Sequence, residues 1–167
     1  ERLSVGYVGA LRAYDYHKQL IDMFANDSRF EFHTYGCGDD TKRLAEYAAR
    51  FDNTYVHGAY KESDKYKIID TFDIMSYNYP YNFVNVGLVA NRYYDSLIMK
   101  NPMFVNPKSE HGKKLIEMNM AVGTDQDADL TVCADKIYNW YNALDAEEFS
   151  TKCDLCLERY VRENKAF

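Results

Sequence analysis

The chain has no run of 18 apolar residues, so it lacks the pattern of an ordinary membrane-spanning helix. Basic residues are not in excess either, because 20 Lys and Arg stand against 26 Asp and Glu, a formal charge of −6. The sequence therefore offers no general basic field to nucleic acid or to an anionic membrane. Its start does not resemble a signal peptide, and we expect a cytoplasmic protein. It begins at Glu1 without Met and enters a strand at once, which predicts an excised domain.

Metal-binding patterns are also missing. Only Cys153 and Cys156 form a CxxC, no second CxxC or histidine pair completes a zinc set, and we expect reduced thiols. The acidic stretch DQDAD has Leu130 where a calcium loop needs Gly and Lys136 where it needs Glu. Asp129 is instead predicted to cap the helix that follows. The sequence thus predicts no metal site, and the four histidines are scattered: His17, His33, His57 and His111.

Common catalytic fingerprints are absent as well. The sequence contains neither the dinucleotide pattern GxGxxG nor the P-loop pattern GxxxxGK[ST]. No Ser/His/Asp triad can be argued from its spacing.

Apolar, β-rich runs alternate with helical patterns along the whole chain. The predicted strands are 3–9, 30–36, 54–60, 73–79, 103–106 and 120–125. The predicted helices are 15–27, 40–51, 62–72, one beginning near 88, 109–119, 130–145 and 146–164. At 167 residues this order predicts one α/β domain: a Rossmann-like, doubly wound parallel sheet of about six strands, three layers thick, with C-terminal helices.

Candidate binding residues lie in the loops that follow strands, because doubly wound sheets bind ligands beyond the carboxyl ends of their strands. The first such loop offers a turn glycine and cations that can neutralise phosphate, and the second offers a Gly-x-Gly. A turn with solvated cations remains the alternative for the first loop. These candidates are Gly9, Arg12, Lys18, Gly36 and Gly38.

The stretch VANRYYDSLIMKNPMFVN, residues 89–106, follows a long loop of Tyr, Asn and Gly. Its helix would point free N–H groups into the same cleft, which is a ready anion site. Arg92 and Asp95 lie one turn apart on one face, so Arg92 can meet a diphosphate while Asp95 accepts hydrogen bonds from ribose hydroxyls. An ordinary surface ion pair between these two residues is the open alternative.

Four stretches in this order carry a family resemblance: YVGALRAYDYHKQLIDMF, FEFHTYGCGDD, YVHGAYKESDKYKIIDTFDIMSYNY and NRYYDSLIMKNPMFVN. Together they cover nearly the whole chain. They resemble the C-terminal, donor-binding domain of GT-B type glycosyltransferases, the family 4 and family 1-like enzymes of bacterial capsule and lipopolysaccharide assembly.

The resemblance implies roles for individual residues. Arg12 and Lys18 would face the diphosphate of a nucleotide-sugar as catalytic cations, Arg92 stands where the family commonly has Lys, and Asp95 stands where it has a ribose-binding Glu. The remaining donor-binding positions would shape the cleft or approach the sugar: Gly9, Gly36, Gly38, Tyr79 and Asn91.

The resemblance also implies an activity. The parent enzyme would transfer a hexose or related sugar from a nucleoside diphosphate to a saccharide or lipid-linked acceptor, without a cofactor or metal. Its N-terminal domain would bind the acceptor and hold any peripheral contact with the inner membrane. The fragment alone would bind nucleotide weakly and catalyse nothing, and nucleic acid is not an expected partner.

Two departures from the family pattern keep other functions open. The family's second acid would fall at Gly87, and Asp95 is one methylene shorter than Glu. A non-catalytic sugar- or nucleotide-binding or regulatory module is the main alternative. A nucleotide-sugar epimerase on the same architecture is the other, although no converging set of carboxylates or histidines is identified for it.

Overall fold

The protein is described here by a computed structural model that covers residues 2–78, 89–125 and 127–164. Its strands are β1 (Leu3–Val8), β2 (Phe30–Tyr35), β3 (Thr54–Gly58), β4 (Ile74–Ser76), β5 (Met103–Val105) and β6 (Ala121–Gly123). Its helices are α1 (Tyr14–Phe24), α2 (Thr41–Ala48), α3 (Lys65–Ile69), α4 (Asn91–Met99), α5 (Glu110–Glu117), α6 (Leu130–Ala143) and α7 (Ala146–Asn164), with a 3-10 turn, η1 (Glu62–Asp64), before α3. The predicted alternation of strands and helices is confirmed.

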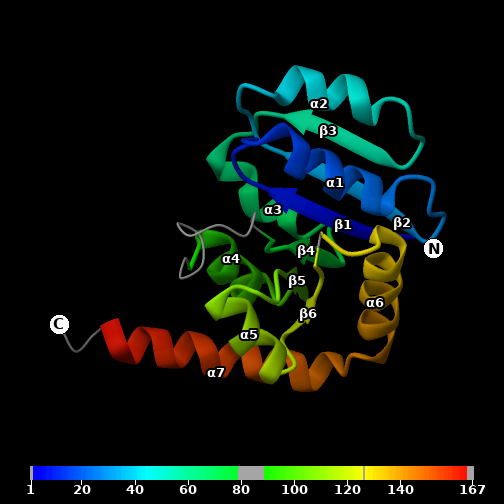
Figure 1. The fold of residues 1–167 in the computed structure, drawn as a ribbon. Coiled ribbons are helices and arrows are strands. Elements are labelled where there is room, and N and C mark those ends of the chain that lie inside the picture. Colours follow the sequence, from blue (N-terminus) through cyan, green and yellow to red (C-terminus); the bar gives the residue numbers. More distant parts are fainter. Residues whose placement is uncertain (1, 79–88, 126, 165–167) are drawn as a thin grey trace.

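Within the described residues the six strands form one sheet, in the order β3-β2-β1-β4-β5-β6 and with every pairing parallel. This is the order of a doubly wound Rossmann sheet. The chain winds outward through β2 and β3, then returns to the centre and winds the other way through β5 and β6. The predicted fold class is therefore confirmed (Figure 1).

Two apolar clusters cover the two faces of the sheet. On one face, α1, α2 and α6 pack on Val5 and Tyr7 of β1 through Phe24, Leu44 and Ile137. The other face is covered by α3, α4, α5 and α7, whose inward residues are Ile69, Leu97, Leu115, Phe149 and Cys153. The fold thus has the three layers expected of an α/β domain.

Gly6 in β1 shows how closely the second face is packed. A Cβ at this position would lie 2.0 Å from a ring carbon of Phe72, which is itself only 5% exposed. The missing side chain lets the Phe72 ring lie directly against the central strand.

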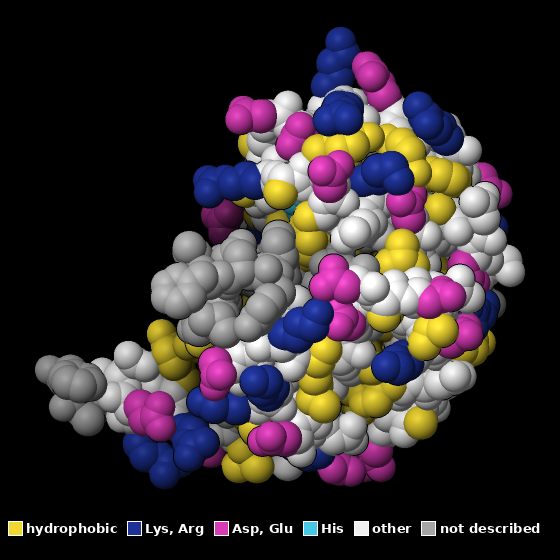
Figure 2. Space-filling view, in the orientation of Figure 1, with side chains coloured by type: hydrophobic (Ala, Val, Ile, Leu, Met, Phe, Trp, Pro, Cys, Tyr) yellow, Lys and Arg dark blue, Asp and Glu magenta, His cyan; other side chains and the backbone are white. Residues whose placement is uncertain are grey.

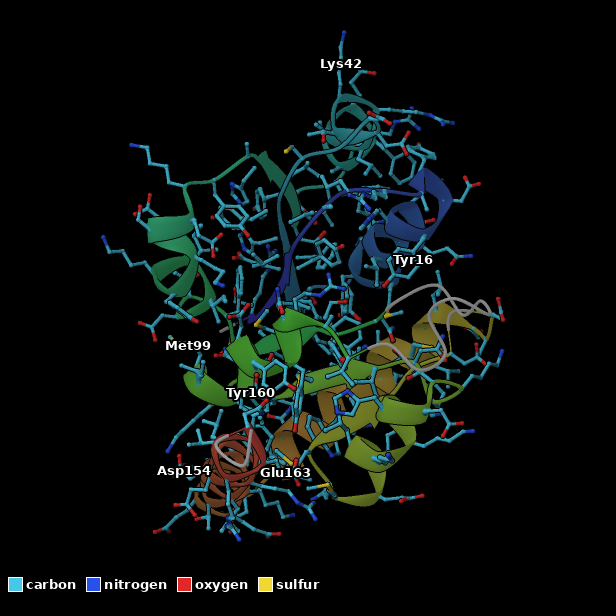
Figure 3. All side chains as sticks on the ribbon, turned by 90° about the vertical axis from the view of Figure 1, so that its left-hand side faces the viewer. Tyr16, Lys42, Met99, Asp154, Tyr160 and Glu163 are labelled. Atoms are coloured by element: carbon cyan, nitrogen blue, oxygen red, sulfur yellow. The ribbon has the colours of Figure 1, made fainter. Side chains whose placement is uncertain are left out.

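The last helix lies along the edge of the molecule and is fastened to α4. The rings of Tyr94 and Tyr160 have centroids 4.5 Å apart, and Lys100 donates hydrogen bonds to Ser150 and Asp154. Figure 3 shows Tyr160 and Asp154 of α7 beside α4, which ends at Met99. No helix in the described ranges is long and apolar enough to cross a membrane.

Side chains cap the first turns of α6 and α5. Asp129 accepts a hydrogen bond from the Thr131 N–H at 2.8 Å, so its predicted role as the cap of α6 is confirmed. Ser109 caps α5 in the same way through the Gly112 N–H. Each cap satisfies a backbone donor that the first turn of a helix leaves free.

Asn53, just before β3, ties three backbone segments together. Its Nδ2 donates to the carbonyl oxygens of Phe24, Asp27 and Phe30, and its Oδ1 accepts from the Asn26 N–H. The side chain is 1% exposed, so these hydrogen bonds are shielded from water.

We expect Asn53→Ala to lower the free energy of unfolding by roughly 3 kcal/mol, because it removes a buried side chain whose hydrogen bonds join three backbone segments. The control is Asn142→Ala, which removes an exposed bond to the Tyr138 carbonyl and should change stability by less than about 0.5 kcal/mol. Urea unfolding followed by circular dichroism measures both, and equal effects would contradict the role given to Asn53.

Candidate functional site

The candidate site lies where β1 and β4 run side by side and their following segments leave in opposite directions. In doubly wound sheets this switch point opens a crevice beyond the carboxyl ends of the strands. Here β1 ends at Val8 and β4 at Ser76, and α4 begins at Asn91 on the same edge. The sequence placed its candidate loops at this edge for the same reason.

Arg92, in the first turn of α4, is a buried cation at this point. It is 6% exposed, and its guanidinium carbon lies 4.3 Å from the centroid of the Tyr7 ring. It also donates to the carbonyl oxygen of Asn78 at 3.4 Å. A Cβ at Gly9 would lie 3.3 Å from its Nη1, so this glycine gives the guanidinium room at the end of β1. Arg92 therefore links α4 to the ends of both central strands.

Asn78, two residues beyond β4, is a further member of the site that the sequence did not single out. It is 0% exposed, and its Nδ2 donates to Thr124 Oγ1 at 2.9 Å. Among the described residues no donor reaches its Oδ1, although buried acceptors are nearly always paired. Its position directly after a strand in SYNY was the only signal in the sequence.

The start of α4 has no side-chain cap, since its N-cap residue is Ala90. The Ala90 N–H donates to the Tyr77 hydroxyl at 3.1 Å, and this hydroxyl lies 2.9 Å from Nδ1 of His111. Burial first, and the charge of Lys114 second, lower the pKa of His111. A neutral imidazole can thus accept a hydrogen bond from the Tyr77 hydroxyl at Nδ1. The bonds orient Tyr77 beside the positive end of the helix dipole.

Asp95 turns away from Arg92 toward α3. Its Oδ1 lies 3.1 Å from Lys65 Nζ, which also pairs with Glu62 at 3.0 Å. Burial acts to lower the pKa of Lys65, but its hydrogen bonds with Glu62 and Asp95 outweigh burial and raise it. Arg92 and Asp95 are both buried and turn to different neighbours, so they do not form the exposed ion pair that was the alternative.

The two cations of the first loop and helix differ in their surroundings. Arg12 is exposed, between β1 and α1. Lys18 donates to Asp22 at 2.6 Å and lies 4.6 Å from the centroid of the Tyr47 ring, in the contact between α1 and α2. The helical phase thus directs Lys18 to α2 and not to Arg92. Asn91 is exposed at the start of α4, and Tyr79 lies outside the described residues.

The glycines of the second loop bring two loops into direct contact. A Cβ at Gly36 would lie 1.7 Å from the carbonyl oxygen of Gly9, and one at Gly38 would lie 2.0 Å from that of Leu11. The backbones are bonded as well, since Leu11 N–H donates to the Cys37 carbonyl at 3.1 Å. Close packing between the loops is a sufficient reason for glycine at both positions.

We expect Gly36→Ala to lower the free energy of unfolding by roughly 3 kcal/mol or more, because its methyl group would overlap fixed backbone. Gly58 is the matched control: its φ is +78°, yet nothing lies within 4 Å of the place that a Cβ would take there. Gly58→Ala should therefore show only the left-handed backbone penalty of about 1 kcal/mol. Chemical denaturation of both variants tests this difference, and an equal loss would rule out the loop contact as its cause.

His17 in α1 shares the Tyr7 ring with Arg92. Its ring meets Tyr7 edge-on at a centroid distance of 4.8 Å, and its side chain is 4% exposed. Burial, with a further contribution from the Arg92 charge, lowers the pKa of His17 from 6.5 to about 4, against a raising hydrogen bond with the Arg12 backbone. His17 is therefore neutral in the folded protein at neutral pH.

This pKa predicts a loss of stability in acid. The unfolded chain takes up a proton near pH 6.5 and the folded chain only near pH 4, so acidification favours unfolding between these values. The His17 contribution is complete above pH 6.5, and about 3 kcal/mol is lost on reaching pH 4. His17→Gln should flatten this part of a stability–pH curve measured by urea unfolding. An unchanged slope would refute the assignment.

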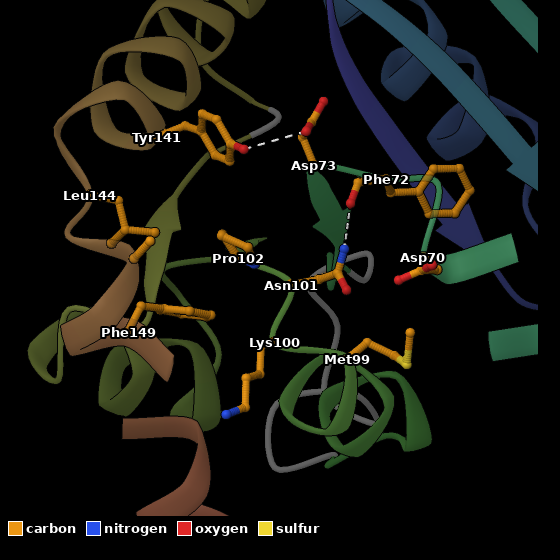
Figure 4. A pocket seen from close by; sticks show the side chains of 11 residues that line it. Asp70, Phe72, Asp73, Met99, Lys100, Asn101, Pro102, Tyr141, Leu144 and Phe149 are labelled. Carbon is orange, nitrogen blue, oxygen red and sulfur yellow. Dashed lines mark hydrogen bonds between the residues drawn. The ribbon is translucent and has the colours of Figure 1, made fainter. Parts of the chain in front are cut away.

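A pocket of about 360 Å³ lies at the opposite edge of the sheet. Asp73, Asn101, Tyr141 and Phe149 are among its lining residues, before β4 and β5 and at the turn from α6 to α7 (Figure 4). Several of its polar side chains are already paired, because Asn101 donates to the Phe72 carbonyl and Tyr141 to Asp73. This hollow is at the amino ends of the strands, away from Arg92, and the Lys100 in its lining donates hydrogen bonds to Ser150 and Asp154.

Metal ligands do not converge at the switch point. In residues 2–78, 89–125 and 127–164 no group of three or more His, Cys, Asp or Glu side chains is placed to hold a metal ion. The four cysteines are free thiols, and burial raises the pKa of Cys153 to about 12, so this thiol is not an activated nucleophile. Figure 2 shows acidic and basic side chains interspersed over one face of the protein.

Comparison with known proteins identifies the fold. No family model matches the sequence, and no curated protein matches it. Among solved structures, the lipopolysaccharide outer core galactosyltransferase WaaB, in its apo form, aligns with a TM-score of 0.67 and 10% identity over 92% of this chain and 45% of its own. Anabaena HepE in complex with UDP gives 0.66 and 12% over 99% and 49%, and a S. aureus TarM complex containing UDP gives 0.63 and 19% over 96% and 35%.

These proteins share a fold with this chain. The chain spans about a third to a half of their lengths. At such low identities the likeness establishes the fold alone, and the chemistry has to be argued from the residues of the switch point.

Proposed function

We propose that this chain is the donor-binding domain of a glycosyltransferase and that it holds a nucleoside diphosphate sugar at the switch point. The observation that carries the proposal is Arg92: a 6% exposed guanidinium, in the first turn of a helix, between the ends of β1 and β4. A second domain of the same protein would bind a saccharide or lipid-linked acceptor of polysaccharide synthesis.

The diphosphate is the group best matched to these surroundings. Sugar transfer leaves negative charge on the departing diphosphate, and fixed cations and helix N–H groups stabilise such charge without a metal. Arg92 supplies the cation, and α4 supplies uncapped N–H groups on the same edge. A guanidinium can meet two phosphate oxygens at once. We infer that the negative phosphate charge is held between Arg92 and the start of α4.

Asn78 and Asp95 can bind the neutral parts of the donor. Asn78 Oδ1 is a buried acceptor that receives no donor from the residues the structure describes, and a sugar or ribose hydroxyl can supply one. The expected ribose contact of Asp95 stays a prediction. Its Oδ1 is engaged by Lys65, so a ribose diol would have to share the carboxylate with that cation.

The solved neighbours suggest the first ligand to test. The named HepE and TarM structures both contain UDP, and a further HepE structure contains UDP-glucose. We propose UDP as the first ligand to test with this chain. GDP, which carries a different base, would show whether the site prefers one base.

Arg92→Gln should weaken UDP binding roughly ten- to hundredfold, the loss expected for hydrogen bonds to a charged group. Amide shifts in a nuclear magnetic resonance titration would report the affinity and map the site to Gly9 and Asn78. Arg50→Gln is the control, because Arg50 lies over the Tyr47 ring at the far end of α2. Circular dichroism would verify that both variants are folded.

Lys18→Gln tests whether Lys18 contacts the diphosphate, as the sequence predicts, or only packs against α2, as its contacts in the structure indicate. A catalytic Lys18 requires this variant to lose binding, whereas its pairing with Asp22 and Tyr47 favours unchanged affinity. The donor-site proposal fails if millimolar UDP and GDP leave the amides around Gly9 and Arg92 unmoved.

The non-catalytic binding module remains the second candidate because of Asp95. Its pairing with Lys65 stabilises the α3–α4 contact and so gives the carboxylate a role without a ligand. Assaying the complete protein with UDP-sugars distinguishes the two functions: transfer or hydrolysis of the sugar supports the enzyme, and nucleotide binding without turnover supports the module.

A further inference from the structure

One part of the sheet has a solvent-facing set of rings. In β2 the side chains alternate, with Phe30 and Phe32 buried under α1 and α2 and Glu31 and His33 partly exposed on the other face. On the neighbouring strand β3, His57 is exposed beside them. Parallel sheets in α/β proteins usually have both faces covered. This edge is thus accessible and carries chemically active side chains.

His33 and His57, 24 residues apart in sequence, meet across the two strands. Nδ1 of His33 lies 3.0 Å from Nε2 of His57, with ring planes 10° apart and ring centroids 5.3 Å apart. The centroid separation is nearly the nitrogen–nitrogen distance plus two ring radii, so the imidazoles lie end to end and do not overlap face to face. One nitrogen of each ring therefore points at the other ring.

Aromatic and acidic side chains flank the pair. The Tyr55 ring stacks on His33 at a centroid distance of 4.8 Å, and the Tyr35 ring stacks on His57 at 4.2 Å. Glu31 lies 3.6 Å from Nε2 of His33, the nitrogen that faces away from His57. A carboxylate on the outer nitrogen of a histidine is the usual support of an imidazole that binds metal through its inner nitrogen.

We propose that His33 Nδ1 and His57 Nε2 together bind a divalent transition-metal ion, with Glu31 orienting His33. This site is independent of the nucleotide site, because it lies on the β2–β3 edge and uses none of the switch-point residues. It had no signal in the sequence, where the two histidines are not at metal-ligand spacing. Only the pairing of β2 with β3 brings them together.

The nitrogen–nitrogen distance fits one shared metal ion. Two nitrogens bonded to a metal at about 2.0 Å are about 2.8 Å apart at adjacent square-planar positions and about 3.3 Å apart in a tetrahedron. The observed 3.0 Å lies between these values. Metal entry therefore does not require the strands to separate. It requires the two rings to tilt so that both nitrogen lone pairs point to the same side. The exposed His57 can supply that tilt.

The protonation state also suits a metal. Burial lowers the pKa of His33 against the effect of Glu31, and burial together with His33 lowers the pKa of His57. The 3.0 Å contact is a hydrogen bond, so one of the two facing nitrogens carries a proton, and metal binding requires that ring to move the proton to its outer nitrogen. No third His, Cys, Asp or Glu of the described chain completes a ligand set, so water fills the other positions. Imidazole pairs of this kind favour Cu²⁺ over Ni²⁺ and Zn²⁺.

The test uses Cu²⁺ and Zn²⁺ titrations of the Cys37→Ser protein, which removes the exposed thiol as a competing ligand. We expect one site with micromolar affinity for Cu²⁺ and a nitrogen hyperfine pattern from two imidazoles in electron paramagnetic resonance. His33→Gln and His57→Gln should each weaken binding at least tenfold. His111→Gln removes a histidine elsewhere and should change the affinity less than twofold.

A second measurement keeps the proposal testable if a variant does not fold. In the unsubstituted protein, Zn²⁺ should shift the ¹⁵N resonances of His33 Nδ1 and His57 Nε2 and leave those of His17 unchanged. The proposal is overturned if Zn²⁺ shifts the resonances of only one of the two rings, if His111→Gln abolishes binding, or if no ion binds below millimolar concentration.

Discussion

The burial of one cation organises the carboxyl edge of this sheet. A guanidinium cannot lose its proton, so burying it at 6% exposure requires acceptors and an electron-rich surface around it. Arg92 finds the Tyr7 ring, the Asn78 carbonyl and the space left by Gly9. These partners come from β1, from the segment after β4 and from α4, which are the parts that define the switch point. The positions of these three segments are thus coupled through one buried charge.

The neighbouring loops give this edge its stiffness. Gly36 and Gly38 let the loop after β2 rest directly on the loop after β1, at distances that no side chain permits. Backbone hydrogen bonds from Gly9 and Leu11 close the same contact. The end of β1 is therefore fixed from one side by another loop and from the other side by Arg92. A site held in this way needs little reorganisation to receive a charged ligand.

Much of the fold was predictable because strand and helix periods are local properties of the chain. The six strands and the Asp129 cap follow from apolar alternation and from the hydrogen bonding of short polar side chains. The expected place of the site followed from topology, and the structure puts Arg92 at that edge of the sheet. The direction of the Lys18 side chain was harder to predict, since a shift of one position along a helix decides whether a cation faces the switch point or α2. Asn78 and the His33–His57 pair depend on strand register, which a single sequence does not display.

The buried charge of Arg92 also couples ligand binding to the protonation of His17. His17 and Arg92 touch the same Tyr7 ring, and the Arg92 charge is the second cause, after burial, of the low pKa of His17. A diphosphate bound at Arg92 would offset that charge and remove part of the penalty on the imidazolium. The pKa of His17 would rise but stay below 6.5, since the larger penalty, burial, is unchanged. An anion at this site would therefore bind more tightly in mild acid, although the same acid weakens the fold.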